Sequence, residues 1–391
     1  MANTLNLGNG DWATKENSLL GYNSENGNYK PLPFDFTRAS SATVVNKSGL
    51  IETAANGTPR IDFLGNTSGA LLLEPQRTNL IPYSDRFNSP PFWSQVALTV
   101  SNNATISPDG TLNASKITRT STSGNARLVH SSVAVSSGAK ATLSAFFKYN
   151  DTDEIILFSP ITLQGKRFSL QNATAGADFV SAPDGYGIEN YGNGWYRFYI
   201  VVTAPSTSVD FTIYVQNNAT TSIYLFGAQI ELGSYATSLI NTQGSAVTRV
   251  ADACLKDDFS ILTVGNSYTL FFDVDLNEKD DNKTFFNIER TSGSTSFTVR
   301  SVLTGMVRVY NNLDSQYPTG NLASSTSKWV VRIDGTSFKI FGAEGSLSGT
   351  LTTARDMGEG IFGRFSQTKI NDFKVYNTAL SDSECEALTQ V

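Results

Sequence analysis

The sequence is poor in the residues on which most enzyme chemistry depends. Its 391 residues include one histidine and two cysteines, and charged residues make up 16% of the chain, below the usual quarter. The histidine, His130, lies in a strand-like stretch, where packing is a more common role than catalysis. Gly-x-Ser-x-Gly, P-loop, His-Glu-x-x-His and Cys-x-x-Cys motifs are missing. These absences set aside most classes of enzyme.

The sequence also lacks an excess of positive charge and the many cysteines of a disulfide-rich protein. The net charge is -6 and no cluster of lysine and arginine occurs, so a nucleic-acid partner is not expected. Cys254 and Cys385 are too few for a disulfide framework, and two reduced thiols are favoured over one bridge.

Long hydrophobic runs are absent too. No apolar run is long enough to span a membrane, and the start of the chain has neither the positive region nor the apolar core of a signal peptide. We therefore expect no membrane insertion, and a protein that is made in a cytoplasm and exposed only later.

Short apolar bursts separated by turn residues dominate the sequence. Between residues 84 and 250 the bursts are five to eight residues long and alternate β-branched or aromatic residues with polar ones, as in Trp195 to Val202. The same pattern continues from 251 to 391, where Asp334-Gly335 predicts a hairpin turn, and Ser381 with Glu384 has the spacing of a capping box before a short helix. The pattern predicts an all-β fold with two antiparallel sandwiches, over 84–250 and 251–391.

The stretch before these sandwiches is predicted to form an extended arm, over 1–35, and a small connector, over 36–83. The arm holds isolated apolar residues in polar surroundings, which also fits a disordered tail. An arm that anchors on another protein is favoured because its larger apolar residues are costly to leave in water; these anchoring candidates are Trp12, Leu19, Leu20 and Tyr22. The second stretch shows short strands between turns and predicts a β-rich connector.

Two cassettes in the sequence carry a resemblance to a known group of proteins. The first runs from Phe36 to Ser84 and includes Phe36-Thr-Arg-Ala-Ser-Ser, Pro59-Arg-Ile-Asp and Leu73-Glu-Pro-Gln-Arg-Thr-Asn-Leu; the second includes Ala228-Gln-Ile-Glu-Leu-Gly and Ala246-Val-Thr-Arg-Val-Ala. Together they resemble cassettes in virion proteins of tailed bacteriophages, such as fibres and spikes. The order of bursts in 84–250 resembles carbohydrate-binding-module jelly rolls, and the ending Phe373-Lys-Val-Tyr to Leu388 resembles laminin-G/concanavalin-like domains.

The resemblance implies a non-enzymatic head fibre or tail fibre that presents glycan-binding modules to the host surface or its mucus. It implies other virion proteins and glycans as partners, a place on the virion surface after synthesis in the bacterial cytoplasm, and a homo-oligomer, with a trimer first among the options. Many copies on one particle would convert weak glycan sites into avidity. No sustained heptad specifies a trimer.

Two other functions stay open. A polysaccharide depolymerase tailspike needs only two suitably separated carboxylates, for which the chain offers Asp151, Asp153 and Glu154, Asp257 and Asp258, and Asp273, Asp275, Glu278, Asp280 and Asp281. A bacterial surface adhesin is the other, although that function predicts a secretion signal. No cofactor is expected. The acidic loop from Glu278 to Asn282 could hold Ca²⁺, but its carboxylates do not have the spacing of an EF-hand loop.

Glycan recognition uses aromatic rings against the apolar faces of sugars, with hydrogen-bonding groups at the rim. Most of the 24 phenylalanines lie inside strand bursts and are expected in the core, as are Trp195 and Trp329. Four tyrosines lie in loop-like sequence beside amides and carboxylates, and these are the predicted carbohydrate contacts: Tyr186, Tyr191, Tyr310 and Tyr317.

Overall fold

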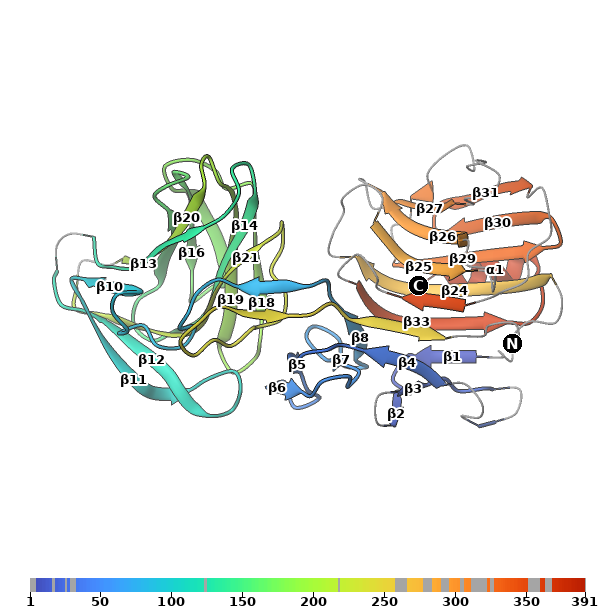
Figure 1. Cartoon of the computed structure of the whole chain (residues 1–391), viewed down its shortest axis with the longest axis horizontal. Coiled ribbons are helices and arrows are strands. Elements are labelled where there is room, and N and C mark those ends of the chain that lie inside the picture. The colour runs from blue at the N-terminus through green and yellow to red at the C-terminus, as the bar shows by residue number, and fades with distance from the viewer. Residues whose placement is uncertain are drawn as a thin grey trace. The chain divides into compact units, whose positions relative to one another are not determined.

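The computed structural model describes most of the chain. The described residues are 5–15, 18–24, 27–28, 33–122, 125–216, 219–256, 266–276, 283–289, 295–302, 306–310, 322–323, 327–350, 359–362 and 368–390. Nearly all of the regular structure in them is antiparallel β-sheet, with one short helix (Figure 1). The predicted all-β class is confirmed. Among these residues, no helix is long and apolar enough to cross a membrane.

The chain divides into two compact units, and neither is continuous in sequence. Unit 1 contains residues 1–41, 54–76 and 250–391, and unit 2 contains residues 42–53 and 77–249. The chain therefore passes from one unit to the other four times. These boundaries differ from the predicted connector 36–83 and sandwiches 84–250 and 251–391, because the connector's strands are shared between the two units.

Unit 1 is built from two large antiparallel sheets. The first has the order β31 (Gly345–Thr350), β30 (Ser337–Gly342), β29 (Lys328–Asp334), β24 (Ser267–Leu276), β33 (Thr368–Tyr376), β8 (Ala70–Leu73) and β7 (Ile61–Asp62), with β1 (Leu5–Gly8) also on β33. The second has the order β2 (Ala13–Lys15), β3 (Ser18–Leu20), β4 (Pro33–Thr37), β23 (Ala253–Lys256), β32 (Glu359–Phe362), β25 (Lys283–Glu289), β26 (Thr295–Val302), β27 (Met306–Tyr310) and β28 (Leu322–Ala323).

The core of unit 1 follows from alternation along these strands. On β24, Leu270, Phe272 and Val274 are buried in the main cluster with Leu5, Leu7 and other residues of β1, β8, β29 and β33. The opposite face of the first sheet carries Phe271, on which a smaller cluster around the helix packs. Side chains two apart on a strand share a face, so one strand serves both clusters.

The helix and the hairpin near the C-terminus confirm their sequence signals. Helix α1 (Asp382–Thr389) begins after Ser381, whose side chain accepts from the Glu384 amide while the Glu384 side chain accepts from the Ser381 amide. This is the predicted capping box. The predicted hairpin is β29 with β30, turning at Gly335 and Thr336, one residue later than expected, with Gly335 at φ 60°.

The predicted extended arm is wrong in structural terms, because the N-terminal residues are strands of unit 1. Leu5 to Gly8 pair with Asp372 to Val375 on β33, and β3 and β4 lead the chain onto β23. In Figure 1 the blue strand β1 lies beside the orange-red β33. Leu5 and Leu7 are buried because their side chains fill the sandwich core.

Unit 2 is a sandwich of two six-stranded sheets. The first, here called the β20 sheet, has the order β10 (Trp93–Val96), β13 (Arg127–Ala134), β20 (Ser208–Gln216), β15 (Glu154–Ser159), β16 (Gln164–Ser169) and β17 (Thr174–Asp178). The second, the β21 sheet, has the order β11 (Leu98–Ile106), β12 (Leu112–Arg119), β21 (Ser222–Leu232), β14 (Lys140–Tyr149), β19 (Trp195–Thr203) and β18 (Gly185–Asn190).

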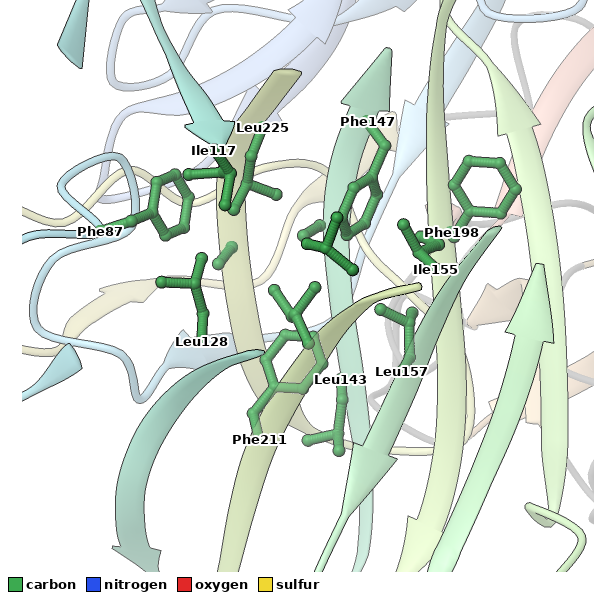
Figure 2. Packing of buried hydrophobic residues seen from close by; sticks show 14 of the residues in the cluster. Phe87, Ile117, Leu128, Leu143, Phe147, Ile155, Leu157, Phe198, Phe211 and Leu225 are labelled. Atoms are coloured by element: carbon green, nitrogen blue, oxygen red, sulfur yellow. The ribbon is translucent and has the colours of Figure 1, made fainter. Parts of the chain in front are cut away.

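The inner faces of these sheets form one apolar core. Figure 2 shows Leu143 and Phe147 of β14 packed with Ile155 and Leu157 of β15 and Phe211 of β20. Two further strand pairs complete the regular structure; they are β5 (Ala42–Val45) with β6 (Ile51–Ala54), and β9 (Arg77–Asn79) with β22 (Val247–Arg249).

Candidate functional site

Several charged residues in or next to the two cassettes are buried in polar clusters. In unit 1, Arg38 and Arg60 meet the two carboxylates Glu74 and Asp252, and all four side chains are inaccessible to solvent. Arg60 bonds to both carboxylates, with 2.7 Å to Glu74 Oε2, while Arg38 Nη1 lies 3.1 Å from Asp252 Oδ1. Two positive and two negative groups balance, which is how buried charges are tolerated.

Backbone groups complete this cluster. Arg38 also donates to the carbonyls of Ser40 and Ala55, and Asp252 Oδ2 accepts from the Glu74 amide at 2.8 Å. Burial on its own would lower the pKa of Arg60, but Glu74 and Asp252 raise it above its usual value. The cluster therefore holds four segments of unit 1 together and offers no group to a ligand.

The Gln229-Ile-Glu231 part of the second cassette has a similar structural role in unit 2. Both polar side chains point to the outer face of β21, because they alternate with the core residues Ala228 and Ile230. Gln229 Oε1 accepts from the Ile240 amide at 2.8 Å, and Glu231 accepts from the amide and hydroxyl of Thr237. The two side chains thus bind the backbone of the following segment over the β21 sheet.

Arginines close this second cluster. Arg197 of β19 donates to the Thr237 carbonyl and to Ser144, and it lies 3.8 Å from Glu231 Oε1. Arg249 donates to the hydroxyls of Thr237 and Ser238. The cassettes are therefore structural, and a ligand site must be sought elsewhere.

The carboxylates proposed for a depolymerase are engaged in local hydrogen bonds. Asp273 and Asp275 do share a face of β24, and both accept from the side-chain amide of Asn371. Asp151 accepts from Ser222, and Asp153 accepts from Ser169 Oγ and the Gln171 amide. Within the described ranges, no group of three or more His, Cys, Asp or Glu side chains could hold a metal ion. The other carboxylate candidates and the possible Ca²⁺ loop lie outside the described residues; these carboxylates are Asp257, Asp258, Glu278, Asp280 and Asp281.

His130 and the two cysteines are buried rather than poised for chemistry. His130 packs edge-on against Trp93, with ring centroids 4.9 Å apart, and burial lowers its pKa to about 4. Cys254 and Cys385 are free thiols, and burial raises the pKa of each. A thiol with a raised pKa is a poor nucleophile.

The structure separates the four predicted tyrosines. Tyr191 is 7% exposed and packs edge-on against Phe146 at 4.8 Å, so its ring is part of the fold. Tyr310 lies on β27, where the structure describes the backbone alone, and Tyr317 lies outside the described residues. Tyr186 is 50% exposed and is the described member whose ring faces solvent.

Tyr186 lies on strand β18 at the edge of the sandwich, not in a loop as predicted. Its neighbour in register is the buried Ile200, so its side chain projects from the core-facing side of the edge strand. Lys166 Nζ lies 4.5 Å from the centre of its ring, and the Phe168 ring is 6.4 Å away. The Tyr186 ring therefore contacts the ammonium group of Lys166 and lies near the core residue Phe168.

Further polar side chains bond to Lys166 or lie two residues from Lys166 or Tyr186 along the chain. Lys166 Nζ donates to Asp178 Oδ1 at 2.8 Å, and Gln164 Nε2 donates to Asp184 Oδ1 at 2.9 Å. Thr203 Oγ1 donates to the other oxygen of Asp184. We call this set, made of Tyr186, Lys166, Asp178, Gln164 and Asp184, the Tyr186 edge. It combines an aromatic ring with planar hydrogen-bonding groups, which is the chemistry that sugars require.

Sequence reasoning found Tyr186 but missed its neighbours. Gln164 and Lys166 alternate with Gly165 and Arg167 along β16, and a strand assignment would have placed Gln164, Lys166 and Phe168 on one face. The sequence does not show which strand lies opposite that face, because β18 is separated from β16 by β17 and belongs to the other sheet.

The predicted anchoring residues are also placed by the fold. Leu19 is buried in the core of unit 1, and Trp12 packs against that core with its indole nitrogen 3.1 Å from the Ser68 carbonyl. Leu20 is half-buried on β3, and the Tyr22 backbone pairs with Asn6. Leu19 and Trp12 thus make their contacts within unit 1 itself.

Comparisons with known proteins give weak likenesses. No protein-family model and no curated protein matches the sequence. Domains LG4-5 of the mouse laminin alpha1 chain are 10% identical with a TM-score of 0.23, over 66% of this chain and 86% of that one. A mutant Trypanosoma rangeli sialidase is 11% identical with a TM-score of 0.26, over 70% of this chain and 60% of that one.

A phage protein is also among the similar solved structures. Tail fiber protein gp63.1 from a phage of E. coli is 11% identical with a TM-score of 0.20, over 79% of this chain and 41% of that one. Likenesses of this size assign neither a family nor an activity. The class of protein rests on the strands themselves, which form two antiparallel β-sandwich units.

Proposed function

We propose that the protein is a non-enzymatic, glycan-binding component of a tailed-phage virion, carried on a head fibre or a tail fibre. The observation that carries the glycan part is the half-exposed ring of Tyr186, which lies beside Lys166, whose ammonium group is in turn paired with the Asp178 carboxylate. The resemblance of the two cassettes to virion proteins supports the viral part. Their burial in structural clusters agrees with a role in building the appendage.

Binding at the Tyr186 edge would be weak at one site and strengthened by copy number. A ring of this size covers one face of one sugar residue. The remaining donors of Lys166 Nζ and the second carboxylate oxygen of Asp178 can bond the hydroxyls around it. Homo-oligomerisation, with a trimer first, belongs to the same proposal because several identical sites on one particle add avidity. Light scattering on the purified protein tests that part.

A binding experiment with two tyrosine variants tests the site. Tyr186→Ala should weaken binding to the glycans that the wild type recognises on an array by at least about tenfold, because one ring contact contributes on the order of 1 kcal/mol or more. Tyr149→Ala is the matched control, since Tyr149 ends strand β14 of unit 2 with 39% of its surface exposed. Equal binding by both variants would remove the Tyr186 edge from consideration.

A further inference from the structure

A second group of aromatic side chains lies on the outer face of the β20 sheet. Ile155 and Leu157 of β15 belong to the core, so Ile156 and Phe158 point the other way. Tyr214, between the core residues Ile213 and Val215 on β20, points to the same outer face and lies opposite Ile156. We call Phe158, Phe179 and Tyr214, with the two arginines described below, the aromatic face.

The three rings are packed together. The Phe158 and Phe179 centroids are 5.0 Å apart and nearly perpendicular, and Phe179 lies 5.5 Å from Tyr214. Gly165 leaves room for this arrangement, since a Cβ there would come within 2.8 Å of the Phe158 ring. The Phe179 amide donates to the Gly165 carbonyl, which holds the Phe179 backbone beside β16.

Two arginines lie over these rings, and they differ in how their charge is used. Arg167 lies 5.3 Å from the Phe179 ring and is paired with Glu154. Arg127 lies 5.8 Å from the Tyr214 ring, and Nη1 donates to the Asn125 carbonyl at 3.2 Å. Among the residues that the structure describes, no carboxylate pairs with Arg127. Arg127 is half-buried and has no described carboxylate partner, although the chain has a net charge of -6. Such a guanidinium group is suited to bind an anionic ligand.

Strained residues at the rim also point to a contact surface. Leu163 and Val180 have φ of 59° and 64° and are 56% and 67% exposed. The amide of Ser181 donates to the Leu163 carbonyl at 3.1 Å, so the two lie together beside Phe179. A left-handed conformation is unfavourable for residues that carry a Cβ, and it is used here to present apolar side chains to solvent. Strain of this kind is found at functional sites.

We propose that the aromatic face binds an acidic sugar residue, such as a hexuronate or a sialate. The guanidinium of Arg127 pairs with the sugar carboxylate, and the apolar surface of Phe179, Tyr214 and Val180 contacts its C–H groups. This inference rests on the proposed glycan-binding function and adds a chemical class of ligand and a second place of contact to it.

The test compares acidic oligosaccharides with their methyl esters, using the full chain. An array would carry hexuronate- and sialate-containing oligosaccharides, the methyl ester of each, and neutral glycans. The wild type should bind acidic members at least about tenfold better than their esters, since a charged hydrogen-bonded pair is lost on esterification. This preference should fall as the salt concentration rises.

Variants connect this preference to the aromatic face. Arg127→Ala should remove the preference for the acid over the ester, and Arg127→Lys should restore it partly because lysine keeps the charge but not the two-pronged geometry. Arg86→Ala, at an exposed arginine of unit 2, makes the same change in charge and should bind as the wild type does. Circular dichroism confirms that each variant is folded.

The outcomes separate this inference from the proposed function. Binding of neutral glycans that depends on Tyr186, with no preference for acids, would overturn the inference and leave the function standing. An acid preference that Arg127→Ala does not alter would overturn the place of contact. Binding to no glycan would contradict both.

Discussion

At the scale of single residues, some buried polar side chains in the described part of the chain lack part of their hydrogen bonding. His130 is the clearest case, because its Nδ1 bonds to the Ser131 carbonyl at 2.7 Å while its Nε2 is buried with no hydrogen-bond partner in the described part of the chain. Protonation would place a charge beside Trp93 and Phe211, where no described carboxylate pairs with it. The folded state therefore favours the neutral ring.

This gives a prediction for the pH dependence of stability. The pKa of His130 is about 4 when folded and near 6.5 when unfolded, so the unfolded chain binds an extra proton between these values. Stability from this group is complete above pH 6.5 and falls as the pH drops towards 4, by about 3 kcal/mol at most. Urea unfolding at pH 7 and 4.5 should show this loss in the wild type.

The variant His130→Phe supplies the control for this experiment. Its ring does not titrate, so its free energy of unfolding should fall less between pH 7 and 4.5 than that of the wild type. Other groups, such as Asp85 and Asp372, whose pKa values burial raises, titrate alike in both proteins and cancel in the comparison. Identical slopes would show that His130 is not the acid-sensitive group.

At the scale of elements, the four-residue cluster of unit 1 joins the residues that directly follow β4 and β8 to those that directly precede β7 and β23. Asp252 is its centre, because it meets both Arg38 and Arg60. Asp252→Ala should lower the free energy of unfolding by about 3–5 kcal/mol, since two buried arginines would be left with one carboxylate. Denaturant unfolding measures this change.

A surface carboxylate provides the comparison. Asp382 pairs with Arg332 and Lys339 at the start of helix α1, but it is open to solvent. Asp382→Ala should change stability little, because exposed pairs are screened. If both variants lost the same stability, burial would not be what makes the cluster important.

Elements also show how far the sequence predicts this fold. The long strands of unit 2, the C-terminal hairpin and the Ser381 capping box were predicted because each signal is local. Strand β1 was not, because it is too short to show alternation, and its partner β33 lies near the opposite end of the chain. The Tyr186 edge could not be predicted either, because its ring and its cation come from strands of different sheets.

At the scale of the whole molecule, both units are assembled from separate stretches of chain. A free N-terminal arm could be changed without effect on stability, whereas Leu7 is buried in the core of unit 1. Leu7→Ala should therefore cost about 2–5 kcal/mol of unfolding free energy. Thermal unfolding followed by tryptophan fluorescence measures this loss.

The exposed Leu112 of unit 2 is the matched position for this comparison. It is 61% exposed, so Leu112→Ala should unfold at nearly the wild-type temperature. An unchanged midpoint in Leu7→Ala would restore the arm as a detachable segment and would support virion anchoring by residues 1–35.

The pairing of β1 with β33 implies that unit 1 completes its fold after unit 2 during translation. Unit 2 is complete in sequence by residue 249, so it can fold while the remaining chain is still being translated. Strand β1 must wait for β33, whose residues are made long after its own. Leu5 and Leu7 therefore spend most of translation without their partners, which makes this part of the nascent chain a natural target for chaperones.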